Sequence, residues 1–173
     1  MKTALVLLIL LGSTYSVGSD RFHYTAQPSV WSEKGKLFYA ESKLRFNLVD
    51  NTMILKDAVM PSFSCGSDTA WMCINNSYLN FAIKRKWTVL PDKWGYEDFS
   101  YEKLSSGEVM ILGRRYKVQV VVVKERTAEP YTWNIVYYSR LNGILMFHVY
   151  DGESDQLSTF ISSNKKGLFS VQG

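Results

Sequence analysis

The sequence is poor in the residues from which most metal and cofactor sites are built. Its 173 residues include two cysteines, two histidines and four prolines. A structural zinc site needs four ligands, and a catalytic one needs three and a water molecule. Cys65, Cys73, His23 and His148 would make such a set only if distant parts of the chain happened to meet. We therefore expect no metal site and no cofactor.

The signature motifs of several enzyme classes are also absent. The chain contains no Walker A motif, no Rossmann glycine fingerprint, no H-E-x-x-H and no EF-hand loop. It has no G-x-S-x-G nucleophile elbow either. These absences favour a protein without catalysis. Two hydrolase alternatives stay open: general acid–base chemistry by His148, or by the pair of carboxylates Glu97 and Asp98, since carboxylate pairing depends on the fold.

Long apolar runs are lacking except at the N-terminus. Lys2 precedes an apolar stretch over residues 4–11, and small residues follow, which is the layout of a secretory signal peptide over residues 1–18, cleaved after Ser16 or Gly18. The stretch is shorter than the roughly 20 residues that a membrane helix needs, and no later one reaches that length. We expect residues 19–173 to be a single soluble domain, periplasmic or secreted, with no integral membrane segment.

A strong charge of one sign is missing as well. The formal net charge is +4, and the basic runs at residues 84–86, 114–115 and 165–166 are short and scattered. A nucleic-acid-binding domain usually shows a concentrated basic face. We therefore expect no nucleic acid partner. Asn75 begins an N-glycosylation sequon, which has meaning only in a eukaryotic source.

The cysteines Cys65 and Cys73 are separated by seven residues. This spacing is not the C-x-x-C of a redox pair, and a free thiol is unfavourable in an oxidising compartment. A disulfide is the interpretation that remains, and closing a loop of about nine residues stabilises a protein by roughly 2.5 kcal/mol. The closed loop carries Trp71, whose indole either packs into the core or is presented for recognition.

Aromatic residues are abundant, at 14% of the chain. Aromatic and β-branched residues favour strands, and strand signals with turns between them recur along the sequence. We predict a mainly β fold with little helix: an antiparallel β-sandwich or a partly closed barrel built from hairpins.

Three hairpins are predicted by alternation and turn residues. In the first, Asp50-Asn51 is the turn, so that Leu48 faces Met53 and Phe46 faces Leu55 on one apolar face. The second joins residues 109–112 and 116–124 through Gly113-Arg114. The third turns at Asn142-Gly143 and places Tyr137 opposite His148. A further strand is expected at residues 78–84, a loop with at most one helical turn at 87–106, and a last hairpin around residues 164–166.

Export, a disulfide and many Tyr and Trp residues favour a protein that binds a partner, because these side chains are enriched at interfaces. The expected partner is another protein, such as an enzyme or toxin that the chain inhibits as immunity proteins do. The alternative is a carrier for a small apolar ligand, with Met146 among the residues that line its cavity. The candidate binding residues are Trp71, Trp94, Tyr96, Tyr137, His148 and Tyr150.

Overall fold

A computed structural model describes residues 21–26, 29–33, 36–40, 43–65, 68–126, 133–152, 155–163 and 166–170. The predicted signal peptide at residues 1–18 lies outside this part of the chain. Every regular element in the described residues is a β-strand. The prediction of a mainly β, antiparallel fold is therefore confirmed.

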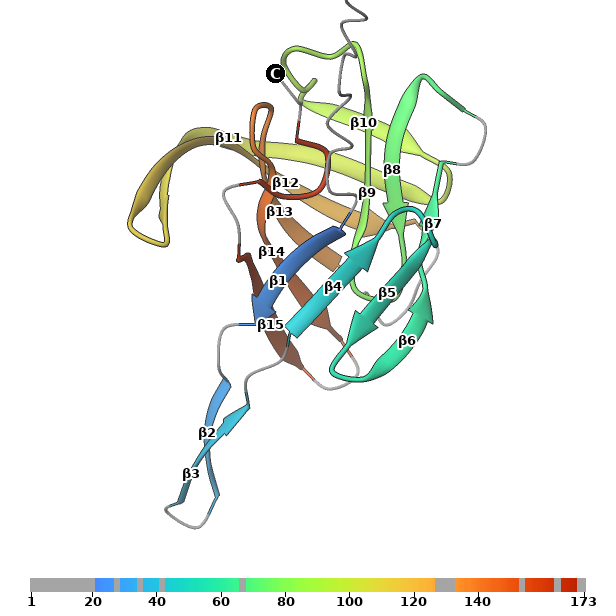
Figure 1. Cartoon of the computed structure of the whole chain (residues 1–173). Helices are drawn as coiled ribbons and strands as arrows, with labels where there is room; N and C mark the ends of the chain where they lie inside the picture. Colours follow the sequence, from blue (N-terminus) through green and yellow to red (C-terminus); the bar gives the residue numbers. More distant parts are fainter. Residues whose placement is uncertain are drawn as a thin grey trace, which may run out of the picture.

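Ten strands form one antiparallel sheet (Figure 1). Its two edges are β10 and β6, so the sheet is not closed into a barrel. The order of the strands across the sheet is β10 (Lys93–Tyr96), β11 (Phe99–Ile111), β12 (Arg114–Glu125), β13 (Trp133–Ser139), β14 (Gly143–Asp151), β15 (Gln156–Ser162), β1 (Arg21–Ala26), β4 (Lys43–Asn47), β5 (Thr52–Leu55) and β6 (Ala58–Pro61).

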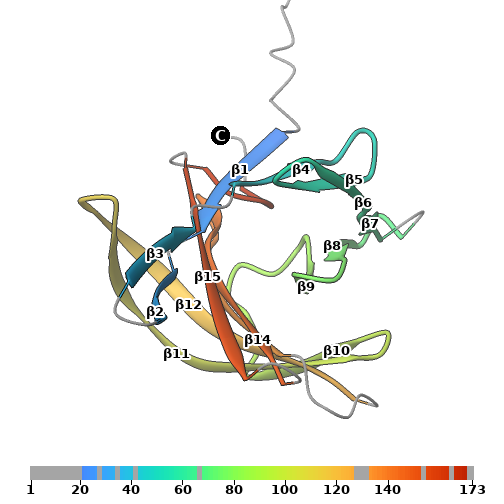
Figure 2. The same ribbon diagram turned by 90° about the horizontal axis from the view of Figure 1, so that it is seen from below.

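A second sheet has three strands, β7 (Phe63–Ser64), β8 (Trp71–Asn75) and β9 (Asn80–Lys84). Figure 2 shows the large sheet curved into an arc, with the small sheet lying at its opening between β6 and β10. Two facing antiparallel sheets are consistent with a β-sandwich. The strands β2 (Ser29–Glu33) and β3 (Lys36–Ala40) pair with each other in a separate hairpin.

The core fills the concave side of the large sheet. Alternate residues of β13 and β14, such as Val136 and Phe147, are fully buried there and share one cluster with Phe81 of β9. Phe46 and Met53 reach the same cluster from β4 and β5. Alternation thus determines which side chains face inward on the central strands.

The β4–β5 hairpin has a different register from the predicted one. Phe46 faces Met53 and Leu44 faces Leu55, because residues 48–51 form a longer turn than Asp50-Asn51 alone. The shift is two residues, so the same side chains remain on the apolar face. Leu44, Phe46 and Met53 are all buried.

The β13–β14 hairpin is also shifted by two residues. Tyr137 faces Met146 and His148 faces Ile135, because the turn consists of residues 140–142 and Gly143 follows it with a φ of 75°. A register irregularity next to Tyr137 accommodates the extra residue. The pairing of Tyr137 with His148 was therefore wrong, although both lie on the same face.

Other predictions need correction. Residues 87–106 were expected to form a loop, but they include β10 and the beginning of β11. The β11–β12 turn is Leu112-Gly113, with φ of 49° and 74°, one residue earlier than predicted. The last hairpin is reduced to an isolated bridge between Leu168 and Ile144, since β15 pairs with β14 and β1 instead.

Candidate aromatic binding site

The disulfide between Cys65 and Cys73 is present, with Cα atoms 5.2 Å apart, as predicted. It closes the connection from β7 to β8. Asp68 organises the second half of this loop: its carboxylate accepts a hydrogen bond from the Ala70 amide at 3.0 Å, and its carbonyl accepts one from the Trp71 amide at 3.3 Å. Trp71 therefore enters β8 from a loop that is covalently closed and internally hydrogen-bonded.

Three tryptophans and a tyrosine meet where the small sheet approaches β10. We call Trp71, Trp87, Trp94 and Tyr96 the aromatic cluster. The ring centroids of Trp71 lie 4.6 Å from Tyr96 and 5.6 Å from Trp87, and Trp87 lies 5.7 Å from Trp94. All four side chains are half-buried. Three of the predicted binding residues are thus brought together, and Trp87 joins them.

The cluster is anchored to the core at one end. The Trp94 indole stacks on buried Tyr101, with centroids 5.1 Å apart and planes at 6°, and its Nε1 donates a hydrogen bond of 2.8 Å to the carbonyl of Ala82. At the other end, Lys84 Nζ lies 5.2 Å from the Trp71 ring centroid and 5.9 Å from that of Trp87. Such a cation over two indole faces is attracted by their negative faces.

A cleft of about 380 Å³ adjoins Trp71. It separates the closed loop from the turn after β4 and from the C-terminal segment. Phe22 and Phe169 contribute further apolar surface, and Asp68 and Arg85 contribute charge. Among the described residues, no carboxylate forms an ion pair with the exposed Arg85 guanidinium. The cleft therefore combines aromatic walls with an available cation.

Trp71 both packs inward and lines this cleft. Its ring contacts the main hydrophobic cluster, yet it remains partly accessible. Burial raises the pKa of its neighbour Tyr96, and the adjacent Glu97 carboxylate raises it further. Tyr96 consequently stays neutral and able to donate a hydrogen bond at physiological pH.

The other three candidates, Tyr137, His148 and Tyr150, lie on the convex face of the large sheet. Their neighbours in β13 and β14 point into the core, so alternation directs these three side chains away from it. Since the sheet is not closed into a barrel, this face does not line a barrel interior. The six candidate binding residues are therefore divided between the aromatic cluster and the convex face of the large sheet.

His148 is held on that face by contacts with Thr159 and Tyr137. Its Nδ1 lies 2.7 Å from Thr159 Oγ1, and its ring makes an edge contact with Tyr137 at 5.4 Å. Burial lowers the pKa of His148, which favours the neutral imidazole. Tyr150 donates a hydrogen bond of 2.9 Å to Asp155. The partner of His148 is thus a threonine of β15.

Glu97 and Asp98 form the turn between β10 and β11, and both are exposed. Glu97 has a φ of 50° and interacts with the phenol of Tyr96. In the described part of the chain, no group of three or more His, Cys, Asp or Glu residues is arranged to hold a metal ion.

Sequence reasoning missed Trp87, Lys84 and Arg85 as members of this site. The signal was present in the run "KRKW" at residues 84–87, where basic residues meet an indole. Its importance depends on β9 ending beside Trp71. Pairing of Trp71 with Lys84 across β8 and β9 creates the cation–π contact.

No protein-family model matches the chain, and neither a curated protein nor a solved structure shows significant similarity to it. Within the described residues there is also no helix with the length and hydropathy to cross a membrane.

Proposed function

We propose that the chain is an exported binding protein that recognises a partner protein through the aromatic cluster and performs no reaction. The observation that carries this proposal is the gathering of Trp71, Trp87, Trp94 and Tyr96, all half-buried, beside a disulfide-closed loop. Trp and Tyr are the residues most often found at the energetic centres of interfaces.

The site is organised before any partner arrives. The disulfide closes the loop that precedes Trp71, and Trp94 is held by its hydrogen bond to Ala82. Ordering side chains on binding costs about 0.5–1.5 kcal/mol for each flexible side chain. A cluster that is already fixed avoids much of this cost, which supports a role in recognition.

Charge favours an acidic partner. Lys84, Arg85 and Lys86 follow one another beside the cluster, and the described residues hold no ion pair with any of them. Complementary charge speeds association and selects among partners. An enzyme or toxin with an acidic surface, neutralised outside the cytoplasm, fits this site. The disulfide is compatible with such an oxidising location.

The experiment begins with the oxidised chain immobilised and exposed to periplasmic or secreted proteins of its source. The captured protein is identified by mass spectrometry and purified, and its Kd is measured by calorimetry. Trp71→Ala should weaken binding by about 30-fold, as for a central interface residue. Arg85→Glu should weaken it too, and more strongly at low salt.

Trp133→Ala is the matched control. Trp133 is also half-buried and stacked on a tyrosine, Tyr150, but lies on the convex face. The Trp133→Ala variant should leave the Kd unchanged. The proposal would be contradicted if Trp133→Ala weakened binding as much as Trp71→Ala does. It would also be contradicted if Trp71→Ala kept both its unfolding midpoint and the wild-type affinity.

A further inference from the structure

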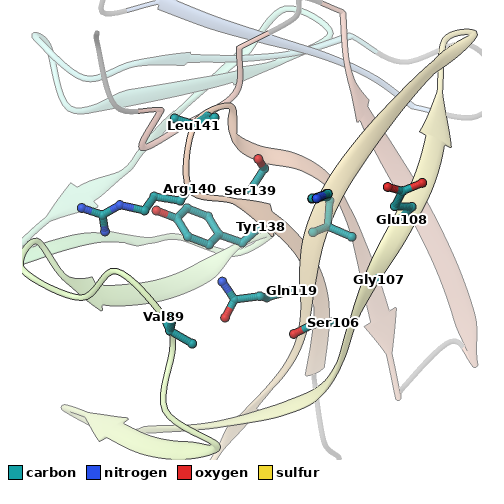
Figure 3. Close-up of a pocket in the computed structure, with 11 residues that line it drawn as sticks. Val89, Ser106, Gly107, Glu108, Gln119, Tyr138, Ser139, Arg140 and Leu141 are labelled. Carbon is teal, nitrogen blue, oxygen red and sulfur yellow. The ribbon is translucent and has the colours of Figure 1, made fainter.

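A second concave site lies away from the cleft beside Trp71. It is a groove of about 530 Å³ between the segment that precedes β10, the β11–β12 ribbon and the turn after β13 (Figure 3). This volume falls in the range of about 300–1,000 Å³ that is typical of small-molecule sites. Its surface is mostly apolar, and Arg140 and Glu108 lie on opposite sides of it (Figure 3).

The apolar part of the groove is accessible to solvent. Val89 and Leu141, on two different segments at its sides, are 68% and 73% exposed. Val118 lies in the buried part of the lining. Large exposed apolar side chains that flank a concave surface indicate a binding site for an apolar group.

One end of the groove holds a hydrogen-bond donor that the protein does not use. Tyr138 is 3% exposed as a whole residue and lines the groove. Within the described residues its hydroxyl has no hydrogen-bond partner, and Asn80 Oδ1 is the one fully buried side-chain polar atom that lacks one. The Tyr138 hydroxyl is therefore accessible from the groove, where a ligand can accept its hydrogen bond.

Arg140 stands beside this hydroxyl. Figure 3 shows the two side chains lying next to each other at one end of the groove. The guanidinium donates one hydrogen bond to the carbonyl of Trp87, which orients it and leaves its other N–H groups for a ligand. A second cation, Lys117, and a single anion, Glu108, complete the charged lining.

The carbonyl oxygen of a neighbouring side-chain amide is already used. Gln119 Oε1 accepts a hydrogen bond of 3.1 Å from the Leu90 amide, which braces the wall of the groove. The groups beside it are therefore all donors: the Tyr138 phenol, the Arg140 guanidinium and the Gln119 Nε2 group. Together they match a carboxylate, which accepts hydrogen bonds and balances the positive charge.

We propose that this groove binds a single-chain amphiphile with a carboxylate head, such as a long-chain fatty acid. Its chain lies against Val89, Val118 and Leu141, and its carboxylate accepts hydrogen bonds from Tyr138 and Arg140. The site is separate from the aromatic cluster and extends the proposed function to a second ligand.

Calorimetry with laurate and with dodecanol, both below their aggregation concentrations, tests the groove. The two probes have the same chain length and differ in the charged head. Wild-type protein should bind laurate at least about tenfold more tightly, because a hydrogen bond to a charged group contributes more than one between neutral groups. Tyr138→Phe should weaken laurate binding more than dodecanol binding and so reduce this preference, because a hydrogen bond to a carboxylate is stronger than one to a hydroxyl.

Each control variant makes the same substitution at a residue outside the groove. Tyr116→Phe changes a half-buried tyrosine of β12 that is not in the groove lining, and should not affect either probe. Leu141→Glu should abolish binding of both probes. Leu112→Glu alters a leucine that is 68% exposed in the β11–β12 turn and should abolish neither.

Two results would overturn the proposal: no saturable binding of laurate by the wild-type chain up to millimolar concentration, or an unchanged laurate preference in Tyr138→Phe. Trp71→Ala should bind laurate like the wild type. Loss of laurate binding in that variant, with its unfolding midpoint preserved, would refute the separation of the two sites.

Discussion

The Tyr24 hydroxyl of β1 donates a hydrogen bond of 2.6 Å to the carbonyl of Ile144 in β14, 120 residues further along the chain. It also accepts one of 3.0 Å from the amide of Leu168. Tyr24 is fully buried, and burial raises the pKa of its phenol. One neutral side chain thus connects the first described strand, the hairpin β13–β14 and the C-terminal segment.

Tyr24→Phe should destabilise the protein by about 1–3 kcal/mol, because it leaves a buried carbonyl and a buried amide without this partner. Urea denaturation measures the loss. Tyr116→Phe, which removes a hydroxyl from a half-buried side chain, should change stability by less than about 0.5 kcal/mol. Equal effects in the two variants would show that the buried connection contributes nothing specific.

Gly167→Ala should be more damaging. A Cβ built on Gly167 would lie 1.6 Å from the Ile144 carbonyl oxygen, so the C-terminal segment would have to move off β14. We expect a loss of about 3 kcal/mol or more. The control is Gly107→Ala, where no heavy atom lies within 4 Å of the added methyl group. Similar thermal midpoints for both variants would contradict this prediction.

Replacing both cysteines by serine should lower the free energy of unfolding by about 2.5 kcal/mol, since the Cys65–Cys73 loop is no longer closed in the unfolded chain. Reduction of the wild-type disulfide should have a similar effect and should leave the double variant unaffected. If reductant lowered the free energy of unfolding of the double variant as well, the effect of reductant on the wild type could not be assigned to opening of the loop.

His148→Gln should alter the pH dependence of stability. Burial holds the pKa of His148 below that of an unfolded histidine, about 6.5, so the folded state binds fewer protons in the window between the two values. The associated stability is fully present above about pH 6.5 and is lost as the pH falls through the folded pKa. Between pH 7 and 5 the wild type should lose more free energy of unfolding than His148→Gln.

The matched substitution is His23→Gln, which changes an exposed side chain on β1. Its stability should follow that of the wild type over the same pH range. A pH profile of His148→Gln that is parallel to the wild-type profile would refute the role assigned to His148.

The hairpins show how far a local pattern reaches. Phe46 and Met53 were predicted on one apolar face and are buried there, because side chains alternate strictly along a strand. Their partners were wrong by two residues, since the turn at residues 48–51 is longer than its most turn-like dipeptide. A shift of two residues keeps every side chain on its face, so the pattern did not distinguish the two registers.

The candidate site shows the opposite limit. Trp71, Trp94 and Tyr96 were individually chosen as binding residues, but their contact depends on how the small sheet meets β10. Trp87 was overlooked because it lies in the connection between β9 and β10, and only the packing of the small sheet brings its ring beside Trp71 and Trp94. Tyr137 and His148 share a face as predicted, yet the sheet does not close into a barrel around it, and Tyr137 packs there against a second hydrophobic cluster.

Local features of the sequence were sufficient to predict the β class and the disulfide. Alternation and turn residues are local, and two cysteines in a chain without other thiols have one possible intramolecular pairing. The contacts between aromatic rings, the bridging of three segments by the Tyr24 hydroxyl, and the position of the Tyr138 hydroxyl beside Arg140 could not be predicted in this way. These relationships join residues far apart in the chain, and they follow from the curvature of the large sheet and the position of the small sheet at its opening.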